Sequence, residues 1–190
     1  AAAGVGHLAL DADIAVGNLE STLSTDGAPT QGDDSFGASP ALVPVLRRAG
    51  FDAVSLANNH AGDYGPRALV ETVRALRASA VRPFGAGRDV KASSMPALVE
   101  RGGVTFAFVG FNAIGETPRA TRGQAGALSV RMPPRTGPLV PADLDRVAAV
   151  VSAYDRRADV VVVLPHWGTQ YTHRPEPVQR RVARRLVAAG

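Results

Sequence analysis

Short apolar runs separated by amphipathic segments predict a layered α/β domain. Each run has the length of a single strand, and two of them flank Arg101-Gly102-Gly103, a pattern typical of a hairpin. The run at residues 159–164 is the most continuous, so we expect a fully buried strand there. The expected strands are residues 13–17, 51–57, 81–85, 97–100, 104–111 and 159–164.

Four amphipathic segments predict helices between or after these strands. Ser39 precedes a proline and is expected to cap the first helix, which Gly50 ends. We expect Leu42, Val45 and Leu46 on the buried face of that helix. The other helices are expected at residues 66–80, from residue 141 onward and at residues 176–189, and the segment rich in Gly and Pro at residues 112–139 predicts a long loop.

Three of the predicted strands end in polar side chains. Asn18 and Glu20 follow the first strand, Asn59 and His60 follow the second, and His166 follows the last. Ligand groups gather at the carboxyl ends of strands in α/β sheets, so these ends form a candidate site. Carboxylate, amide and imidazole groups suit a divalent metal pair such as Mn, Fe or Zn, which could clamp a phosphate and generate hydroxide.

Each of these residues also has a purely structural interpretation. Asn58 and its neighbour tolerate the backbone angles of a turn, Glu20 can cap a turn, and His166 can be a core histidine bonded to a carbonyl. Asp63 or Gly65 is expected to cap the second helix. Polar residues at three strand ends of one domain favour a common site over three separate structural roles.

Other catalytic chemistries have weaker support. Glu20 has no second acid at a strand end, which disfavours a glycosidase. No Gly-x-Ser-x-Gly elbow is present, which disfavours a serine hydrolase. His7 and His173 do not follow strands and are interpreted as surface histidines.

Composition excludes several classes of protein. A chain of 190 residues with 45% hydrophobic residues is long enough for one domain with its own core. It has no apolar run long enough to span a bilayer, and the lack of cysteine excludes disulfides, thiol catalysis and Cys-ligated zinc. The chain begins at Ala1 rather than Met, so we expect that an upstream segment, such as an export signal or anchor, has been removed.

The formal charge of +4 comes almost entirely from arginine, because Lys91 is the only lysine. The arginines are spread along the chain instead of gathering with aromatic residues, which favours a coding bias over nucleic-acid binding. The last predicted helix is the exception and would suit an acidic polymer, although a solvated face explains it equally well. This helix carries Arg180, Arg181, Arg184 and Arg185.

Three motifs in order make the chain similar to the CapA family. These are poly-γ-glutamate capsule-synthesis proteins, related to calcineurin-like metallophosphoesterases. The resemblance covers nearly the whole chain, and the three motifs are more specific together than any one is alone. They are residues 12–20, residues 50–60 with Asp63-Tyr64-Gly65, and His166-Trp167-Gly168 with Tyr171, Pro175 and Gln179.

The resemblance implies a four-layer α/β/β/α fold of the metallophosphoesterase type with a dinuclear metal site. On that pattern Glu20 is expected to be a bridging carboxylate, Asn59 a metal ligand and His166 a ligand of the second metal. His60 would stabilise the transition state or donate a proton. The metal pair would be Mn, Fe or Zn.

The chain also departs from the family pattern. No Gly-Asp strand end precedes Asn18, Gln170 stands where the family commonly has Glu, and the Gly-His-His-Pro-His segment expected after Gly190 is absent. We therefore expect residues 1–190 to be a fragment of a single CapA-like metallophosphatase domain that lacks its first and last strands. Such a fragment should bind metal weakly, with Asn18 and Asn58 supporting the ligands.

Two functions compete on this basis. The first is a metal-dependent hydrolase of cell-envelope polymer synthesis, acting on an anionic polymer or a phosphoester. The second is a non-catalytic accessory subunit that binds anionic polymer in a synthesis or export complex. In either case we expect no nucleic-acid partner, membrane-bound synthase or export subunits as partners, and a location at the extracellular face of the cell envelope.

Overall fold

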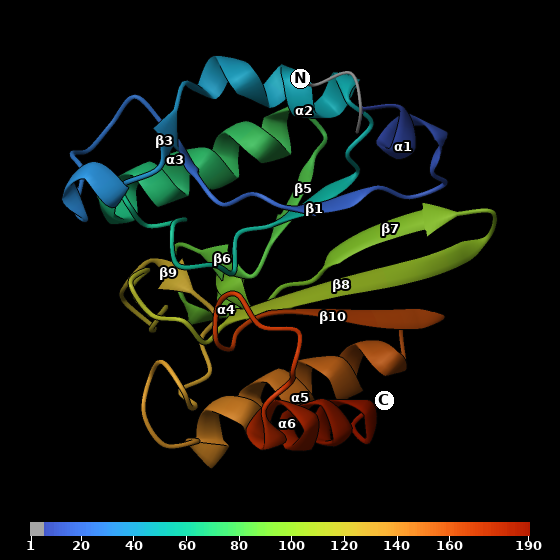
Figure 1. The fold of residues 1–190 in the computed structure, drawn as a ribbon. Helices are drawn as coiled ribbons and strands as arrows, with labels where there is room; N and C mark the ends of the chain where they lie inside the picture. Colours follow the sequence, from blue (N-terminus) through green and yellow to red (C-terminus); the bar gives the residue numbers. More distant parts are fainter. Residues whose placement is uncertain (1–5) are drawn as a thin grey trace.

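The computed structural model describes residues 6–190 as two sheets enclosed between two layers of helices (Figure 1). The strands are β1 (Val16–Asn18), β2 (Thr22–Leu23), β3 (Gly37–Ala38), β4 (Ala53–Ser55), β5 (Arg82–Phe84), β6 (Ala86–Gly87), β7 (Ala97–Arg101), β8 (Val104–Asn112), β9 (Gly126–Ala127) and β10 (Val160–His166). The helices are α1 (Gly6–Asp11), α2 (Val43–Arg48), α3 (Gly65–Ala78), α4 (Val90–Ser93), α5 (Pro141–Asp155) and α6 (Pro177–Val187), with 3₁₀ turns at Gly32–Asp34 and Pro40–Leu42.

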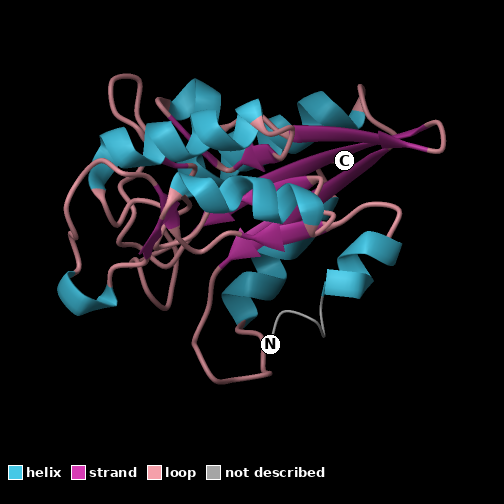
Figure 2. Cartoon of the chain, turned by 90° about the horizontal axis from the view of Figure 1, so that it is seen from above, coloured by secondary structure: helices cyan, strands magenta, loops and turns pink. Residues whose placement is uncertain are grey.

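Each main sheet has three strands. The first has the order β1-β4-β5 and is parallel throughout. The second has the order β10-β8-β7, in which β10 runs parallel to β8 and β7 runs antiparallel to it. The pairs β2-β3 and β6-β9 form two small additional sheets. Figure 2 shows the β7–β8 hairpin extending past the helices at one end, so the carboxyl ends of β8 and β10 lie at the opposite end.

Three apolar layers hold the four structural layers together. Along β8, Val109 and Phe111 face α5 and α6, whereas Phe106 and Phe108 face the other sheet. This alternation is the period-two pattern of a strand whose two faces are both covered. On the other side, Val54 and Leu56 pack against α3. The predicted α/β class and its α/β/β/α layering are therefore confirmed.

Most of the predicted elements are present with small shifts at their ends. The β7–β8 hairpin is confirmed, as are α3, α5 and α6. Helix α6 buries Val178, Val182 and Leu186 and begins with a capping box between Glu176 and Gln179. His173 is exposed as predicted, whereas the side chain of His7 lies outside the described part of the structure.

The predicted buried face of the first helix is correct for Leu46, which packs against the core, but wrong for the other two residues. Leu42 and Val45 are 48% and 44% exposed, and Val43 is the buried residue. Ser39 does cap the segment, since its Oγ accepts from the Ala41 amide at 3.2 Å. The segment opens with a 3₁₀ turn before α2, which rotates the later side chains away from their expected positions.

Strand β10 also differs from its prediction. It is half-buried instead of fully buried, and Val160 is 38% exposed. Within the described residues β10 pairs only with β8, so it is an edge strand here. The predictions that residues 1–190 form one domain and lack its first and last strands remain predictions. Of the helices within residues 6–190, none combines the length and the apolarity needed to cross a membrane.

The segment at residues 112–139 is a packed part of the core, not a free loop. Its Leu128, Val130 and Met132 are at most 1% exposed. Asp143 at the start of α5 fixes the segment from one side. Its carboxylate accepts a bidentate pair of hydrogen bonds from Arg119 and a further bond from the Arg131 amide at 3.1 Å.

The two sheets approach each other closely near their polar ends. A Cβ added to Gly110 of β8 would lie 2.9 Å from Ser55 Oγ and 3.0 Å from Ala57 Cβ. Gly85 meets the same alanine from β5, where its Cβ would lie 2.5 Å from Ala57 Cβ, and its φ of +80° also favours glycine. The absence of side chains here lets β8 and the segment after β4 pack directly together.

Replacing Gly110 with alanine should therefore lower the free energy of unfolding by about 1–3 kcal/mol, because the added methyl group overpacks the space between the sheets. Urea unfolding followed by circular dichroism measures this. Gly123 is the matched control, since an added Cβ there meets nothing within 4 Å. The Gly123→Ala variant should stay within about 0.5 kcal/mol of the parent, and equal stability of both variants would contradict the close approach.

Asp143 should make the stability of the protein depend on pH. Burial alone would raise the pKa of Asp143, but the hydrogen bonds from Arg119 and the Arg131 amide, with the nearby charge of Arg146, hold that pKa below its ordinary value of 3.8. A carboxyl group with a lowered folded pKa stabilises the protein above its unfolded pKa. That stabilisation is lost as the pH falls through the folded value.

Asp143→Asn should thus destabilise the protein by about 1–3 kcal/mol at pH 7, with the gap to the parent narrowing as the pH drops below about 4. Urea unfolding at several pH values gives the measurement. Asp145→Asn on the same helix is the control, because Asp145 is exposed and its pair with Arg185 spans 3.4 Å. A pH-independent gap for Asp143→Asn would show that its charge has no role.

Candidate functional site

The polar ends of β1, β4 and β10 meet at one edge of the two sheets. Asn18 is the last residue of β1 and pairs in register with Ser55 of β4. The Leu19 amide continues this pairing by donating to the Ser55 carbonyl at 3.0 Å. His166 is the last residue of β10. The structure therefore places together the side chains that the sequence placed at three strand ends.

A chain of side-chain contacts joins the first sheet to the second. His166 Nε2 donates to Asn59 Oδ1 at 2.8 Å and lies 3.5 Å from Glu20 Oε1. The other carboxylate oxygen of Glu20 accepts from Asn18 Nδ2 at 2.9 Å. Three of the predicted site residues, Glu20, Asn59 and His166, thus converge on one point.

Asn58 supports this arrangement from beneath. It is fully buried, and its Nδ2 donates to Asn18 Oδ1 and to the Leu19 carbonyl, both at 2.9 Å. Its Oδ1 accepts from the His60 amide at 3.0 Å. Asn58 therefore shapes the turn after β4 and also fixes the positions of the site residues around it. The turn and the candidate site that the sequence offered as alternatives are both present here.

His60 is held in one orientation by two other side chains. Its Nδ1 lies 2.8 Å from Asp63 Oδ2, and the Phe36 ring stacks on the imidazole with centroids 4.1 Å apart and planes 17° apart. Asp63 is 1% exposed and also accepts from the Phe36 amide at 2.7 Å. Gln31 donates to the other oxygen of this carboxylate. The imidazole is therefore positioned from one side by a buried carboxylate and from another by an aromatic face.

The prediction that Asp63 or Gly65 caps the second helix is wrong. The cap residue of α3 is Tyr64, and no side chain bonds to the first turn. Sequence reasoning missed Asp63 as a partner of His60, although the two residues are three positions apart. It also missed Phe36, because the loop around this residue has no periodic pattern.

Electrostatics favour a neutral His166. Burial lowers the pKa of His166, the Glu20 carboxylate opposes this shift, and the nearby His60 adds to it. Glu116 contributes a smaller effect in the same direction as Glu20. A neutral imidazole does not repel a cation, so this half-buried position suits a metal ligand.

Glu20, Asn59 and His166 offer three donor atoms, which could hold one divalent ion. Ligand atoms about 2.1 Å from a single ion lie about 3.0–3.4 Å apart, close to the 2.8 and 3.5 Å separations that join Asn59 and Glu20 to His166. Within residues 6–190, no group of three or more His, Cys, Asp or Glu residues is close enough to hold a metal. The cluster reaches three donors only because Asn59 contributes an amide oxygen.

Comparison with known proteins places this chain among capsule-synthesis proteins. Residues 2–190 match the family described as "Bacterial capsule synthesis protein PGA_cap". A CapA capsule biosynthesis protein of Bacillus anthracis is 32% identical over 80% of this chain and 36% of its own length. The CapA protein of Bacillus subtilis, a PGA biosynthesis protein, is 29% identical over 94% of this chain and 45% of its own length.

A third relative has a different description. It is a Mycobacterium tuberculosis protein named "Probable polyglutamine synthesis accessory protein", 32% identical over 94% of this chain and 47% of its own length. The chain thus spans about half the length, or less, of the curated relatives it matches. A crystal structure of a candidate 5′-nucleotidase from Staphylococcus aureus superposes with a TM-score of 0.43 and 18% identity, over 70% of this chain and 24% of that one. That similarity is too low to assign a fold or a function.

The buried amide of Asn58 makes a testable contribution to this site. Asn58→Ala should lower the free energy of unfolding by about 1–3 kcal/mol, because it leaves the Leu19 carbonyl and the His60 amide without their partner. Urea unfolding measures the loss. Asn18→Ala is the control, since Asn18 is exposed and water can replace its bonds. Equal losses in both variants would mean that Asn58 has no special supporting role.

Proposed function

The chain belongs to the family of bacterial capsule synthesis proteins, and we propose that its polar cluster is the metal-binding, hydrolytic centre of a protein of cell-envelope polymer synthesis. The observation that carries this proposal is the convergence of Glu20, Asn59 and His166, from two different sheets, beside an oriented His60. A structural role alone does not require an imidazole, a carboxylate and an amide to meet at a partly exposed edge.

Glu20, Asn59 and His166 would hold one divalent ion, Mn, Fe or Zn. When bound, such an ion would polarise a phosphoryl or carbonyl oxygen and lower the pKa of a coordinated water. Asn18 and Asn58 hold Glu20 and the turn after β4 in place. The second ion of the predicted dinuclear site would need ligands beyond the three donors of this cluster.

His60 is proposed as the catalytic acid or charge-stabilising group. Its Nδ1 is occupied by Asp63, which leaves Nε2 as the nitrogen for substrate. The Asp63 carboxylate favours the tautomer with a proton on Nδ1. The Phe36 ring limits rotation of the imidazole. His60 can thus hold a proton near the leaving group or stabilise negative charge that develops there.

The second candidate function is non-catalytic. The relative from Mycobacterium tuberculosis has the name of an accessory protein, and the described cluster contains only three donors for a metal. On this alternative the chain binds anionic polymer as an accessory subunit of a synthesis or export complex. Under either proposal the protein acts at the cell envelope, on an anionic polymer or a phosphoester, alongside membrane-bound synthase or export subunits.

Metal titration tests the leading proposal. Calorimetry with Mn²⁺ should show one binding event per chain, weakened about tenfold or more in His166→Ala and Glu20→Ala, since each variant removes one of three ligands. His173→Ala is the matched control, because this exposed histidine lies outside the cluster, and it should bind as the parent does.

The same variants separate the two functions. If the protein is a hydrolase, His60→Ala should reduce the rate of phosphoester or γ-glutamyl hydrolysis about 100-fold or more, as expected for loss of a general acid, without changing Mn²⁺ affinity to the same degree. Metal binding without hydrolysis would favour the accessory subunit. Mn²⁺ affinity that is unchanged by His166→Ala and Glu20→Ala would refute the metal centre.

A further inference from the structure

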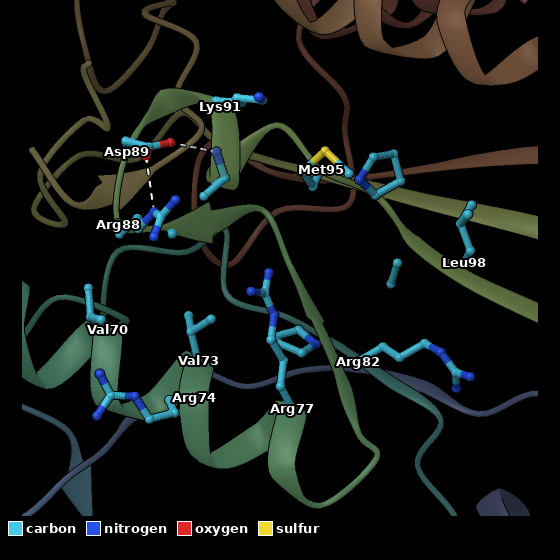
Figure 3. A pocket seen from close by; sticks show the side chains of 15 residues that line it. Val70, Val73, Arg74, Arg77, Arg82, Arg88, Asp89, Lys91, Met95 and Leu98 are labelled. Atoms are coloured by element: carbon cyan, nitrogen blue, oxygen red, sulfur yellow. Dashed lines mark hydrogen bonds and ion pairs between the residues drawn. The ribbon is translucent and has the colours of Figure 1, made fainter. Parts of the chain in front are cut away.

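A basic groove lies on the side of the molecule where the edge strands β5 and β7 of the two sheets are found (Figure 3). It has a volume of about 800 Å³ and runs between α3 and the β5–α4–β7 segment. β5 is the edge strand of the first sheet and β7 is the edge strand of the second. None of the residues that line the groove belongs to the cluster around His166.

The charge in this groove is strongly unbalanced. Five cationic side chains and one carboxylate line it: Arg74, Arg77, Arg82, Arg88, Lys91 and Asp89. All five cations are exposed. In the sequence they are spread over 18 positions, on α3, β5, α4 and the turn before α4, so the fold creates the patch.

The single carboxylate does not neutralise the groove. Asp89 caps α4 by accepting from the Ala92 amide at 2.7 Å, and it also pairs with Arg88 at 3.3 Å. Among the side chains of the described chain, no acidic group forms an ion pair with Arg74, Arg77, Arg82 or Lys91. Positive charges that gather without a counter-charge attract an anionic ligand and steer its approach.

The arrangement of the cations indicates the shape of that ligand. In Figure 3, Arg77 projects from α3 into the space of the groove, Arg74 extends along α3 to the left of the view, and Arg82 extends to the right. The charges therefore follow the length of the groove instead of converging on one point. This pattern fits an extended polyanion better than a single phosphate, which binds where several donors meet.

The other lining residues help to choose the class of polyanion. They include Met95 and Leu98, 47% and 44% exposed, but no aromatic side chain on which a nucleic-acid base could stack. A guanidinium group pairs with a carboxylate through two parallel hydrogen bonds, so a row of arginines suits a row of carboxylates.

We propose that this groove is a second, non-catalytic binding site for an extended polycarboxylate chain, held by Arg74, Arg77 and Arg82 with help from Arg88 and Lys91. The choice of carboxylate rests in part on the proposed function in anionic polymer synthesis. The site would hold a polymer at a place separate from the cluster at the strand ends. It also replaces α6 as the surface for an acidic polymer: the α6 arginines lie on an exposed helix face, and Arg185 is paired with Asp145 at 3.4 Å.

The test compares two triple variants with the same loss of charge. The groove variant, Arg74→Gln/Arg77→Gln/Arg82→Gln, removes three positive charges from the groove. The α6 variant, Arg180→Gln/Arg181→Gln/Arg184→Gln, removes three positive charges from α6. Binding of fluorescently labelled poly-γ-glutamate is followed by anisotropy at low ionic strength, where exposed charges are least screened. The groove variant should bind about tenfold or more weakly, and the α6 variant less than about threefold. Unchanged thermal unfolding of both variants shows that each remains folded.

Several outcomes would overturn this proposal. Absence of binding by the parent chain, equal losses in both triple variants, or no loss in the groove variant would each overturn it. Tighter groove-dependent binding of single-stranded DNA or polyphosphate would overturn the polycarboxylate assignment. The Arg74→Lys/Arg77→Lys/Arg82→Lys variant keeps the charge and should recover part of the affinity.

The Mn²⁺ titration keeps this proposal distinct from the proposed function. The groove variant should bind Mn²⁺ as the parent does. If the groove variant loses polymer binding and the parent binds no Mn²⁺, the groove is supported and the metal centre is refuted. Mn²⁺ binding with unaltered polymer affinity in the groove variant would do the reverse.

Discussion

Gly110 leaves no side chain between β8 and the segment that follows β4, and Ser55 and Ala57 occupy that space. Gly85, which follows β5 in the first sheet, likewise leaves room for Ala57 within that sheet. Because the two sheets come this close at their polar ends, a histidine on one sheet can reach an amide on the other. The 2.8 Å contact between His166 and Asn59 is therefore a consequence of backbone packing several residues away. A bulkier residue between the sheets would separate His166 from Asn59 without contacting either residue.

Much of the fold was predictable because strand alternation and helical spacing are local properties of the sequence. The polar strand ends were also visible, since Glu20, Asn59 and His166 each follow an apolar run. A common site was expected from these strand ends, but the individual contacts depend on the pairing of β1 with β4 and on the approach of β10, which a sequence pattern does not encode. The buried face of α2 was only partly predicted because the preceding 3₁₀ turn changes the helical phase.

The parts that escaped prediction share a physical origin. Phe36 and Gln31 belong to an aperiodic loop, so nothing local marks them as partners of Asp63 and His60. Asp63 has an ordinary interpretation as a helix cap, which hid its contact with the imidazole. The groove arginines looked evenly scattered along the chain, and only the fold gathers them on one side. Contacts between segments that are distant in sequence thus account for the geometry of the cluster at the strand ends, whereas the groove depends on how one continuous stretch, residues 70–98, folds.

The stacking of Phe36 on His60 has a consequence for the thermodynamics of the loop. The Phe36 amide bonds to Asp63, the Phe36 ring covers His60, and Asp63 in turn holds the imidazole. The backbone of the loop is tied to the same turn again, since the Thr30 amide donates to the Asp63 carbonyl at 2.8 Å. Local opening of the loop would therefore remove the ring that covers His60 together with the hydrogen bonds that Phe36 and Thr30 make to Asp63. Any ligand that requires the ordered His60 would also close the loop, and the affinity of that ligand would include the energy of closing it.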